Sequence, residues 1–213
     1  MPRNYSTRDV KEYNTARRIF QKIACGVFIL QGVKAKYNLK KVQGLENFDK
    51  TKQYIVASNH ITGFDPFFVQ SQIKIPIAYM AKKELFEPFW SRVLMDWCGA
   101  FAVDRDNVSV ATIKTALSIK KTTWSLGIFP QGTRCHNGKL ENVSKGFVTM
   151  AKKMNFDILP AGIVLEDTNN KNGKKDIYVK VGKPISCSLS ADEIYSTWCK
   201  EVAQLAGLEY IPE

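Results

Sequence analysis

The chain has 213 residues, enough for one medium-sized domain with a sizeable core and too few for two large ones. Hydrophobic residues make up 45% and aromatic residues 11% of it, which excludes a largely disordered protein. Lys and Arg number 31 against 20 Asp and Glu, a net charge of +11. This excess favours anionic partners: nucleic acid, anionic lipid, phosphorylated metabolites or an acidic carrier protein.

The positive charge is concentrated near the N-terminus. Residues 1–60 carry twelve Lys and Arg and four Asp and Glu, a net +8, whereas residues 61–213 carry a net +3. Apolar side chains in this region recur at helical spacing beside basic ones, which predicts a basic amphipathic helix. The apolar positions are Ile19, Phe20, Ile23, Val27 and Leu30, and the basic ones are Arg17, Arg18, Lys22 and Lys34.

Two environments suit such a helix. Its longest uncharged stretch, residues 23–33, has eleven residues, whereas a helix that spans a bilayer needs about 20. The helix therefore lies in a membrane interface, with Phe20, Val27, Phe28 and Leu30 inserted, or packs on the domain core with a solvated basic face. The sequence alone leaves both open.

The rest of the chain alternates strand-like and helix-like segments. Short apolar runs predict buried strands at residues 54–57, 76–81, 100–103, 126–129 and 158–164. Apolar residues at helical spacing predict helices at residues 86–97 and 147–154. Alternation at residues 177–181 predicts an edge-type strand, and a capping box of Ser190 and Glu193 opens a last helix.

This alternation predicts an α/β fold. We expect a single domain with a central mixed, mostly parallel sheet flanked by helices. The domain covers residues 41–213 and follows the basic amphipathic segment of residues 1–40.

The cysteines indicate free thiols. They are five, an odd number, with no CxxC pair and no histidine at a metal-binding spacing. The chain is also too large to need disulfides for stability, so we expect buried or incidental thiols in a reducing compartment and no metal site. The five are Cys25, Cys98, Cys135, Cys187 and Cys199.

His60 and Asp65 are candidates for acid–base chemistry. His60 follows the first predicted buried strand, and Asp65 lies five residues further, just before Pro66. A carboxylate so placed can accept the Nδ1 proton of the histidine and leave Nε2 free as a base. The same Asp65 would also suit the N-cap of a helix that starts at Pro66. An HxxxxD spacing is common by chance, so this pair alone decides nothing.

A second group of residues has the properties of a phosphate site. The sequence FPQGTR follows the fourth predicted strand, so that Gly132 lies in a turn and Thr133 and Arg134 project from a strand end. A guanidinium binds phosphate through two parallel hydrogen bonds, and a glycine lets the backbone approach an anion. Arg105 is a second candidate cation, with local pairing to Asp104 as the alternative.

Together these residues resemble the 1-acyl-sn-glycerol-3-phosphate acyltransferase family of phospholipid synthesis. The resemblance covers roughly residues 42–185 and includes six motifs in the order that the family has them. They are NHxxxxD at His60 and Asp65, KKELF at residues 82–86, GAFAVDR ending at Arg105, FPxGTR, KG at residues 145–146 and ILPAGI at residues 158–163.

The resemblance implies an activity and a set of roles. The activity is transfer of a fatty acyl group from acyl-CoA or an acyl carrier protein thioester to the free hydroxyl of 1-acylglycerol-3-phosphate, which forms phosphatidic acid. His60 would be the general base and Asp65 would orient it. The acceptor phosphate would bind to the substrate-binding residues Arg105, Gln131, Gly132, Thr133 and Arg134. No cofactor is implied beyond the thioester co-substrate.

Gln131 departs from the family pattern, which more usually has Glu at this position. Gln keeps the size and one acceptor oxygen but loses the charge, so the choice of acceptor is affected more than the type of reaction. The related lipid A acyltransferases usually have Glu at the position of Asp65, so the Asp here favours the glycerophospholipid branch.

Three other functions remain alternatives. The acceptor could be a different lysolipid, or the chain could be a non-catalytic lipid-binding paralogue, for which Gln131 is the only supporting feature. Nucleic-acid binding would explain the charge, but the sequence has no RNA-type aromatic motif, zinc-finger spacing or basic recognition helix. We therefore expect an anionic membrane surface as partner, with the protein peripheral or monotopic on the cytoplasmic face of the cell membrane, and no nucleic acid.

Overall fold

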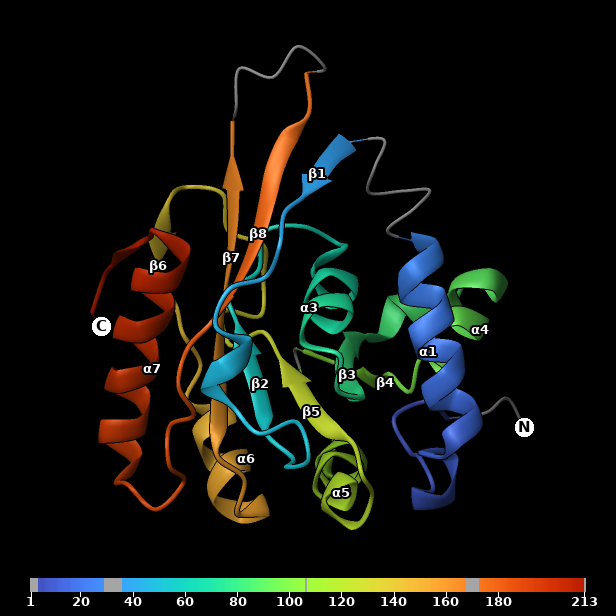
Figure 1. Cartoon of the computed structure of the whole chain (residues 1–213). Helices are drawn as coiled ribbons and strands as arrows, with labels where there is room; N and C mark the ends of the chain where they lie inside the picture. Colours follow the sequence, from blue (N-terminus) through green and yellow to red (C-terminus); the bar gives the residue numbers. More distant parts are fainter. Residues whose placement is uncertain (1–3, 29–35, 106, 168–172, 213) are drawn as a thin grey trace.

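Seven strands form one sheet in the order β1-β8-β7-β2-β5-β3-β4, and helices cover both of its faces (Figure 1). The computed structural model describes residues 4–28, 36–105, 107–167 and 173–212. The strands of the sheet are β1 (Tyr37–Leu39), β2 (Ile55–Ser58), β3 (Ile77–Lys82), β4 (Phe101–Val103), β5 (Ser125–Ile128), β7 (Ile158–Glu166) and β8 (Lys175–Val181). Two short strands, β6 (Lys139–Leu140) and β9 (Glu209–Tyr210), pair separately.

Six α-helices surround the sheet. They are α1 (Thr15–Phe28), α3 (Asp65–Ile73), α4 (Phe89–Trp97), α5 (Val110–Ser118), α6 (Gly146–Met154) and α7 (Ala191–Ala206) among the described residues. The connecting segments include the short 3₁₀ helices η1 (Val10–Glu12), η3 (Leu45–Asn47), η4 (Lys83–Phe86) and η5 (Ile119–Lys121).

The sheet confirms the predicted mixed, mostly parallel arrangement. All neighbouring strands in it are parallel except β7 and β8, which are antiparallel. Each predicted buried strand is present within two residues of its expected ends, and so are α6 and the capping box of α7. The prediction that residues 177–181 form an edge strand is wrong, because β8 lies between β7 and β1. The true edge strand on this side, β1, was not predicted, because its three residues are too few to show an alternation of apolar and polar side chains.

The helix predicted at residues 86–97 is interrupted at Pro88. Pro88 has an extended backbone (φ −68°, ψ 135°) and is the N-cap of α4, so η4 ends at Phe86 and α4 begins at Phe89. The apolar stripe predicted for this helix does not all face the core. Phe89, Trp90 and Trp97 are 57%, 80% and 43% exposed.

Alternation along the strands places one hydrophobic cluster on each face of the sheet. In β2, Ile55 and Ala57 face the cluster under α5, α6 and α7, whereas Val56 faces the cluster that packs against α3. Such two-sided burial is typical of strands in a parallel sheet, and it explains why these strands appear in the sequence as continuous apolar runs.

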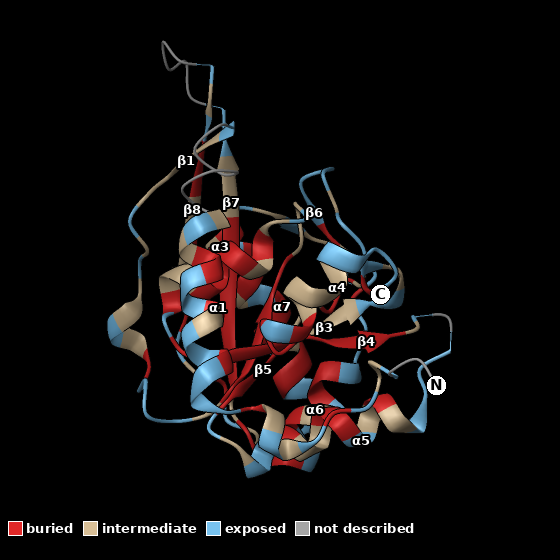
Figure 2. Cartoon of the chain, turned by 90° about the vertical axis from the view of Figure 1, so that its right-hand side faces the viewer, coloured by how far each residue is buried: buried red, intermediate tan, exposed pale blue. Residues whose placement is uncertain are grey.

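The first helix is part of the domain. α1 packs against α3 and α4, with its inner face buried and a row of exposed residues along its outer face (Figure 2). Gln21 on the inner face donates to the carbonyls of Ile77 at 2.6 Å and Cys98 at 2.8 Å. Leu30 and Lys34, predicted to extend the amphipathic pattern, lie outside the described residues.

A buried ion cluster fixes the entry to α1. Arg8 contacts Glu12 at 3.1 Å and Asp96 at 2.9 Å, and Arg17 contacts the same two carboxylates at 3.1 and 3.2 Å. Arg8 also donates through Nε to the Ala100 carbonyl at 2.8 Å. Two of the basic residues counted in the N-terminal charge are therefore neutralised inside the protein.

Removing Arg8 should destabilise the whole domain. Arg8→Ala leaves buried Asp96 and half-buried Glu12 with one guanidinium and removes the donor to the Ala100 carbonyl, so we expect a loss of about 3 kcal/mol in the free energy of unfolding. Urea unfolding followed by tryptophan fluorescence measures this loss. Arg18→Ala, which removes an exposed arginine of α1, is the matched control and should change stability by less than about 0.5 kcal/mol. Equal midpoints for the two variants would show that the cluster does not anchor α1.

Candidate active site

The candidate residues converge on one edge of the sheet. β2, β5, β3 and β4 are parallel and adjacent, so their carboxyl ends lie side by side. His60 follows β2, the FPQGTR loop follows β5, and Arg105 follows β4. Ligands of open α/β sheets bind at this edge.

His60 and Asp65 form a close pair. His60 Nδ1 lies 2.6 Å from Asp65 Oδ2, and the Asp65 side chain is completely buried. An ionised carboxylate can only accept, so this contact suits a neutral imidazole that carries its proton on Nδ1 and has its lone pair on Nε2. That is the tautomer that a general base would require.

Asp65 organises the whole turn between β2 and α3. Its Oδ2 also accepts from the backbone N–H groups of Ile61 at 2.6 Å and Thr62 at 2.9 Å, and its Oδ1 accepts from the Thr62 hydroxyl at 2.7 Å. The alternative role as helix cap is wrong. Asp65 is the first residue of α3, Phe64 is the N-cap, and the carboxylate points back to the turn.

The FPQGTR loop surrounds His60. Gln131 Oε1 accepts from the His60 N–H at 3.4 Å, and the Cys135 N–H donates to the His60 carbonyl at 2.9 Å. The ring of Phe129 stacks on the imidazole with centroids 4.3 Å apart. Gly132, predicted to lie in a turn, has φ +67°, a left-handed conformation that favours glycine.

Asn59 ties this end of β2 to the next strand. Its side chain donates to the Ile163 carbonyl at 2.9 Å and accepts from the Ile163 N–H at 2.7 Å. No role was predicted for Asn59 from the sequence. Its position as a polar residue directly after a predicted buried strand could have indicated a structural role at the strand end. Its buried position holds the His60 backbone at the sheet edge.

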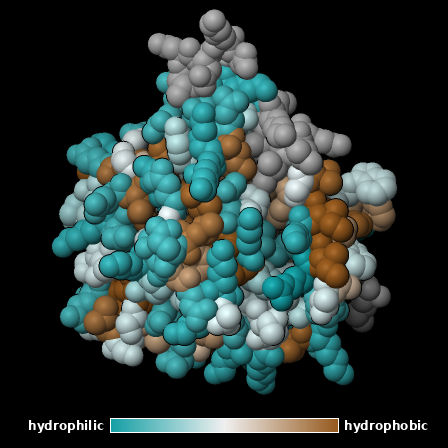
Figure 3. Space-filling view, in the orientation of Figure 1, coloured by the Kyte–Doolittle hydropathy of each residue, from teal (hydrophilic) through white to brown (hydrophobic). Residues whose placement is uncertain are grey.

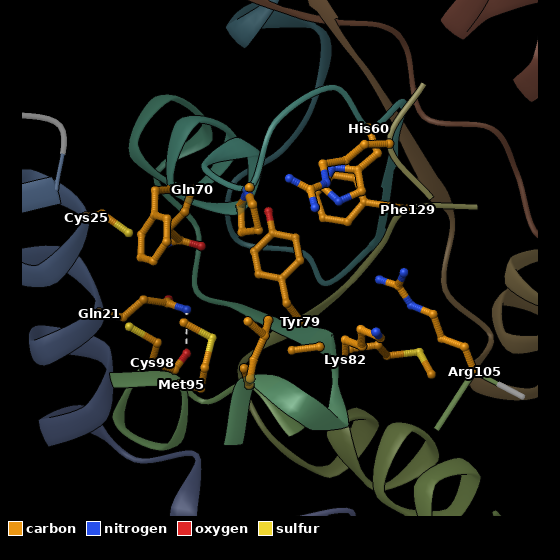
Figure 4. Close-up of a pocket in the computed structure, with 18 residues that line it drawn as sticks. Gln21, Cys25, His60, Gln70, Tyr79, Lys82, Met95, Cys98, Arg105 and Phe129 are labelled. Carbon is orange, nitrogen blue, oxygen red and sulfur yellow. Dashed lines mark hydrogen bonds between the residues drawn. The ribbon is translucent and has the colours of Figure 1, made fainter. Parts of the chain in front are cut away.

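A cavity of about 340 Å³ opens beside His60 and extends between α1, α3 and α4 (Figure 4). At one end lie His60 and Arg105, and at the other Gln21, Cys25 and Cys98. Arg134 also lines the cavity and belongs to the His60 end, because the next residue, Cys135, donates its N–H to the His60 carbonyl. The wall between them is mainly apolar and aromatic, and it comprises Pro66, Phe67, Tyr79, Met80, Leu85, Met95, Ala100 and Phe129. The sequence did not predict this cavity, because its walls come from five separate elements.

The two predicted arginines lie at the exposed end. Arg105 points its guanidinium toward the cavity (Figure 4), and Asp104 pairs with Lys83, so local pairing of Arg105 to Asp104 is not observed. Within the described part of the chain, neither Arg105 nor Arg134 makes an ion pair with a carboxylate. Thr133 is exposed and, with Gly132, lies outside the cavity lining.

The thiols at the inner end are buried and inert. Burial raises the pKa of Cys98 to about 12 and raises the pKa of Cys25 further. All five cysteines are free. Cys25 and Cys98 therefore act as small apolar groups at the closed end of the cavity.

The arrangement suits an amphiphile. Two arginines and an imidazole occupy the polar end, Lys82 is a third cationic residue of the lining, and an apolar interior follows. An anionic headgroup and an aliphatic chain match these two parts, and the free Nε2 can take a proton from a hydroxyl at their junction.

Comparison with known proteins identifies the class of this protein as the acyltransferases. The profile of the Acyltransferase family matches residues 40–164. In structure, the chain is similar to the 1-acyl-sn-glycerophosphate (LPA) acyltransferase PlsC of Thermotoga maritima, with a TM-score of 0.64 over 92% of this chain and 85% of that one. Sequence identity in that alignment is 19%, so this match concerns the fold alone.

Relatives that are similar in sequence specify which acyltransferases this chain resembles. The 1-acyl-sn-glycerol-3-phosphate acyltransferase of Bacillus subtilis is 31% identical over 147 residues, 68% of this chain and 73% of that protein. The Borreliella burgdorferi enzyme of the same name is 32% identical over 132 residues, 61% of this chain. That match spans about half, 52%, of the Borreliella protein. The chain belongs to the 1-acyl-sn-glycerol-3-phosphate acyltransferase family.

Proposed function

We propose that the protein transfers a fatty acyl group from acyl-CoA or acyl carrier protein to the free hydroxyl of 1-acylglycerol-3-phosphate. The product is phosphatidic acid. The observation that carries this proposal is the 2.6 Å contact between His60 and buried Asp65 at the polar end of an apolar cavity. The family relatives named for this reaction support it.

The chemistry needs one base and no acyl-enzyme. Nε2 of His60 removes the proton of the acceptor hydroxyl while its oxygen attacks the thioester carbonyl. A C–O bond forms, the C–S bond breaks, and the imidazolium returns the proton to the departing thiolate. Asp65 stabilises the imidazolium through the Nδ1–H hydrogen bond, and it remains ionised.

The arginines would hold the acceptor phosphate. Arg105 and Arg134 lie at the same end of the cavity as His60 and have no carboxylate partner among the described residues. Both guanidinium groups are therefore available for charge-assisted hydrogen bonds to phosphate oxygens. The Gly132–Thr133 backbone and the Gln131 amide complete the proposed phosphate site. The apolar interior would take the acyl chain that is transferred.

Loss of His60 should abolish transfer. We expect His60→Ala to lower kcat by at least about 10²-fold, since the variant keeps binding but lacks the base. Lysophosphatidic acid and either acyl-CoA or acyl carrier protein thioester serve as substrates, with mass spectrometry of the lipid product. His136→Ala removes the other, exposed histidine and is the matched control. Retention of more than about a tenth of wild-type kcat by His60→Ala would refute the base assignment.

Removal of Arg134 should weaken binding of the acceptor and leave binding of the donor nearly unchanged. Arg134→Ala should raise the acceptor KM or lower kcat/KM for the acceptor strongly, because its phosphate loses a bidentate partner, while the donor KM changes little. Steady-state kinetics with each substrate varied in turn measures both. Equal effects on donor and acceptor would indicate a structural arginine. Gln131→Glu tested with several lysolipids would show whether the uncharged side chain sets the choice of acceptor.

We also propose that the outer faces of α1 and α4 dock on an anionic membrane. Apolar side chains gather over α1 (Figure 3), and exposed aromatic residues of the neighbouring α4 lie close by. Ile19, Ile23 and Trp90 are 54%, 60% and 80% exposed. Among the described residues, no helix has the length and apolar character needed to cross a bilayer. Peripheral or monotopic binding on the cytoplasmic face agrees with this surface.

The docking residues differ from those predicted. Phe20 and Phe28 pack inward on Trp97 and Phe67, with centroids 5.4 and 4.5 Å apart, so the inserted apolar residues would be Ile19, Ile23 and Val27. Leu30 lies outside the described residues, and Arg17 belongs to the buried ion cluster. The exposed cations of α1 are Arg18 and Lys22.

A charge placed on this surface should weaken membrane binding. Ile23→Glu puts a carboxylate where the apolar face meets the headgroups, so we expect less protein to co-sediment with anionic liposomes. Val110→Glu, at an exposed aliphatic residue of α5, is the matched control. Point variants are preferred to truncation because α1 lines the cavity. Equal sedimentation of both variants with the wild type, or equal binding to neutral vesicles, would contradict the docking proposal.

A further inference from the structure

Two buried polar atoms in the cavity wall have no hydrogen-bond partner among the described residues. They are the hydroxyl of Tyr79 and Oε1 of Gln70. Both residues line the cavity and are more than nine-tenths buried, with 7% and 8% exposed. Figure 4 shows both oxygens turned into the cavity beyond Phe129, on the side away from Arg105.

The local structure fixes Tyr79 in this place. Tyr79 of β3 pairs with Gly127 of β5, where a Cβ would lie only 2.4 Å from the tyrosine ring. The glycine therefore lets the ring lie flat across β5, where it stacks on Phe129 with centroids 5.7 Å apart. This stack fixes the direction of the phenol and leaves its hydroxyl over the cavity.

Gln70 is fixed in a similar way. Its Nε2 donates to the Ile75 carbonyl at 2.6 Å, which settles the orientation of the amide and turns Oε1 toward the cavity. Gln21, the other side-chain amide in the wall, donates from Nε2 to the carbonyls of both Ile77 and Cys98. The unpaired hydrogen-bonding capacity of this region thus belongs to Tyr79 and Gln70.

An unpaired buried polar group is destabilising, and an aliphatic chain lying against it does not relieve that cost. One hydroxyl on the chain, lying between the Tyr79 hydroxyl and Gln70 Oε1, would satisfy both atoms. It accepts from the Tyr79 hydroxyl and donates to Gln70 Oε1, which matches one donor and one acceptor. A carbonyl on the chain could satisfy only Tyr79.

We propose that Tyr79 and Gln70 form a subsite for a hydroxyl group carried part-way along the fatty acyl chain. The subsite rests on the proposed function, because it assumes that the cavity holds the acyl chain of the donor. It lies beyond Phe129 as seen from His60, so the hydroxyl belongs to a carbon well removed from the thioester. The substrate class is therefore a hydroxylated long-chain acyl thioester.

Donor competition tests the subsite. Wild-type protein is given palmitoyl-CoA together with hydroxypalmitoyl-CoA donors that differ in the carbon bearing the hydroxyl, and the products are quantified by mass spectrometry. We expect kcat/KM to favour one mid-chain hydroxyl isomer by about tenfold over the plain chain. Tyr79→Phe keeps the ring stack and should abolish this preference. Tyr13→Phe, which removes a buried hydroxyl also without a partner but outside the cavity, should retain it.

A binding measurement separates the subsite from the reaction. Displacement of a fluorescent fatty acid by palmitate and by the hydroxypalmitate isomers needs no turnover, and it should show the same preference and the same loss in Tyr79→Phe. If no donor is used but this preference appears, the proposed function fails and the subsite stands. If the plain and hydroxylated chains bind and react equally in the wild type, the subsite is refuted and the two polar groups are satisfied by water.

Discussion

The site depends on the hydrogen bonds that the Asp65 carboxylate accepts. It is fully buried at the start of α3 and accepts from His60 Nδ1, from two backbone N–H groups and from the Thr62 hydroxyl. A buried carboxylate without such donors would be strongly unfavourable, so the turn between β2 and α3 is shaped around it. The imidazole of His60 is thereby held with Nδ1 toward the carboxylate, at the sheet edge where Arg105 and Arg134 also lie.

A second constraint joins the N-terminal segment to this site. The buried cluster of Arg8, Arg17, Glu12 and Asp96 anchors α1 to the end of α4, and Gln21 anchors it to β3. One face of α1 thereby closes the inner end of the cavity, and the opposite face exposes aliphatic side chains. In our proposal the same helix meets the membrane and bounds the pocket for the lipid chain, so a lipid has only a short distance to move between the two.

The sequence predicted the parts of the structure that depend on local pattern. The buried parallel strands were predicted because each is a continuous apolar run. The start of α7 was predicted because Ser190 and Glu193 form a capping box. Other features depend on distant contacts. β1 is too short to show a pattern, and α5 is rich in β-branched residues, which weakens its helical signal. The Asp65 side chain turns back to the loop, where it contacts His60 and the N–H groups of Ile61 and Thr62. The cavity wall joins Gln21 to Ile77 across more than fifty residues, which no local pattern reveals.

The tautomer of His60 tests the central claim most directly. The chain has two histidines, so ¹⁵N-histidine NMR gives a simple spectrum in which exposed His136 serves as internal reference. At a pH where both imidazoles are neutral, the account predicts that His60 carries its proton on Nδ1 and that Asp65→Asn disturbs this state, while His136 is unchanged. A His60 ring protonated on Nε2, or a mixture of tautomers like that of His136, would contradict the claim that Asp65 prepares His60 as a base.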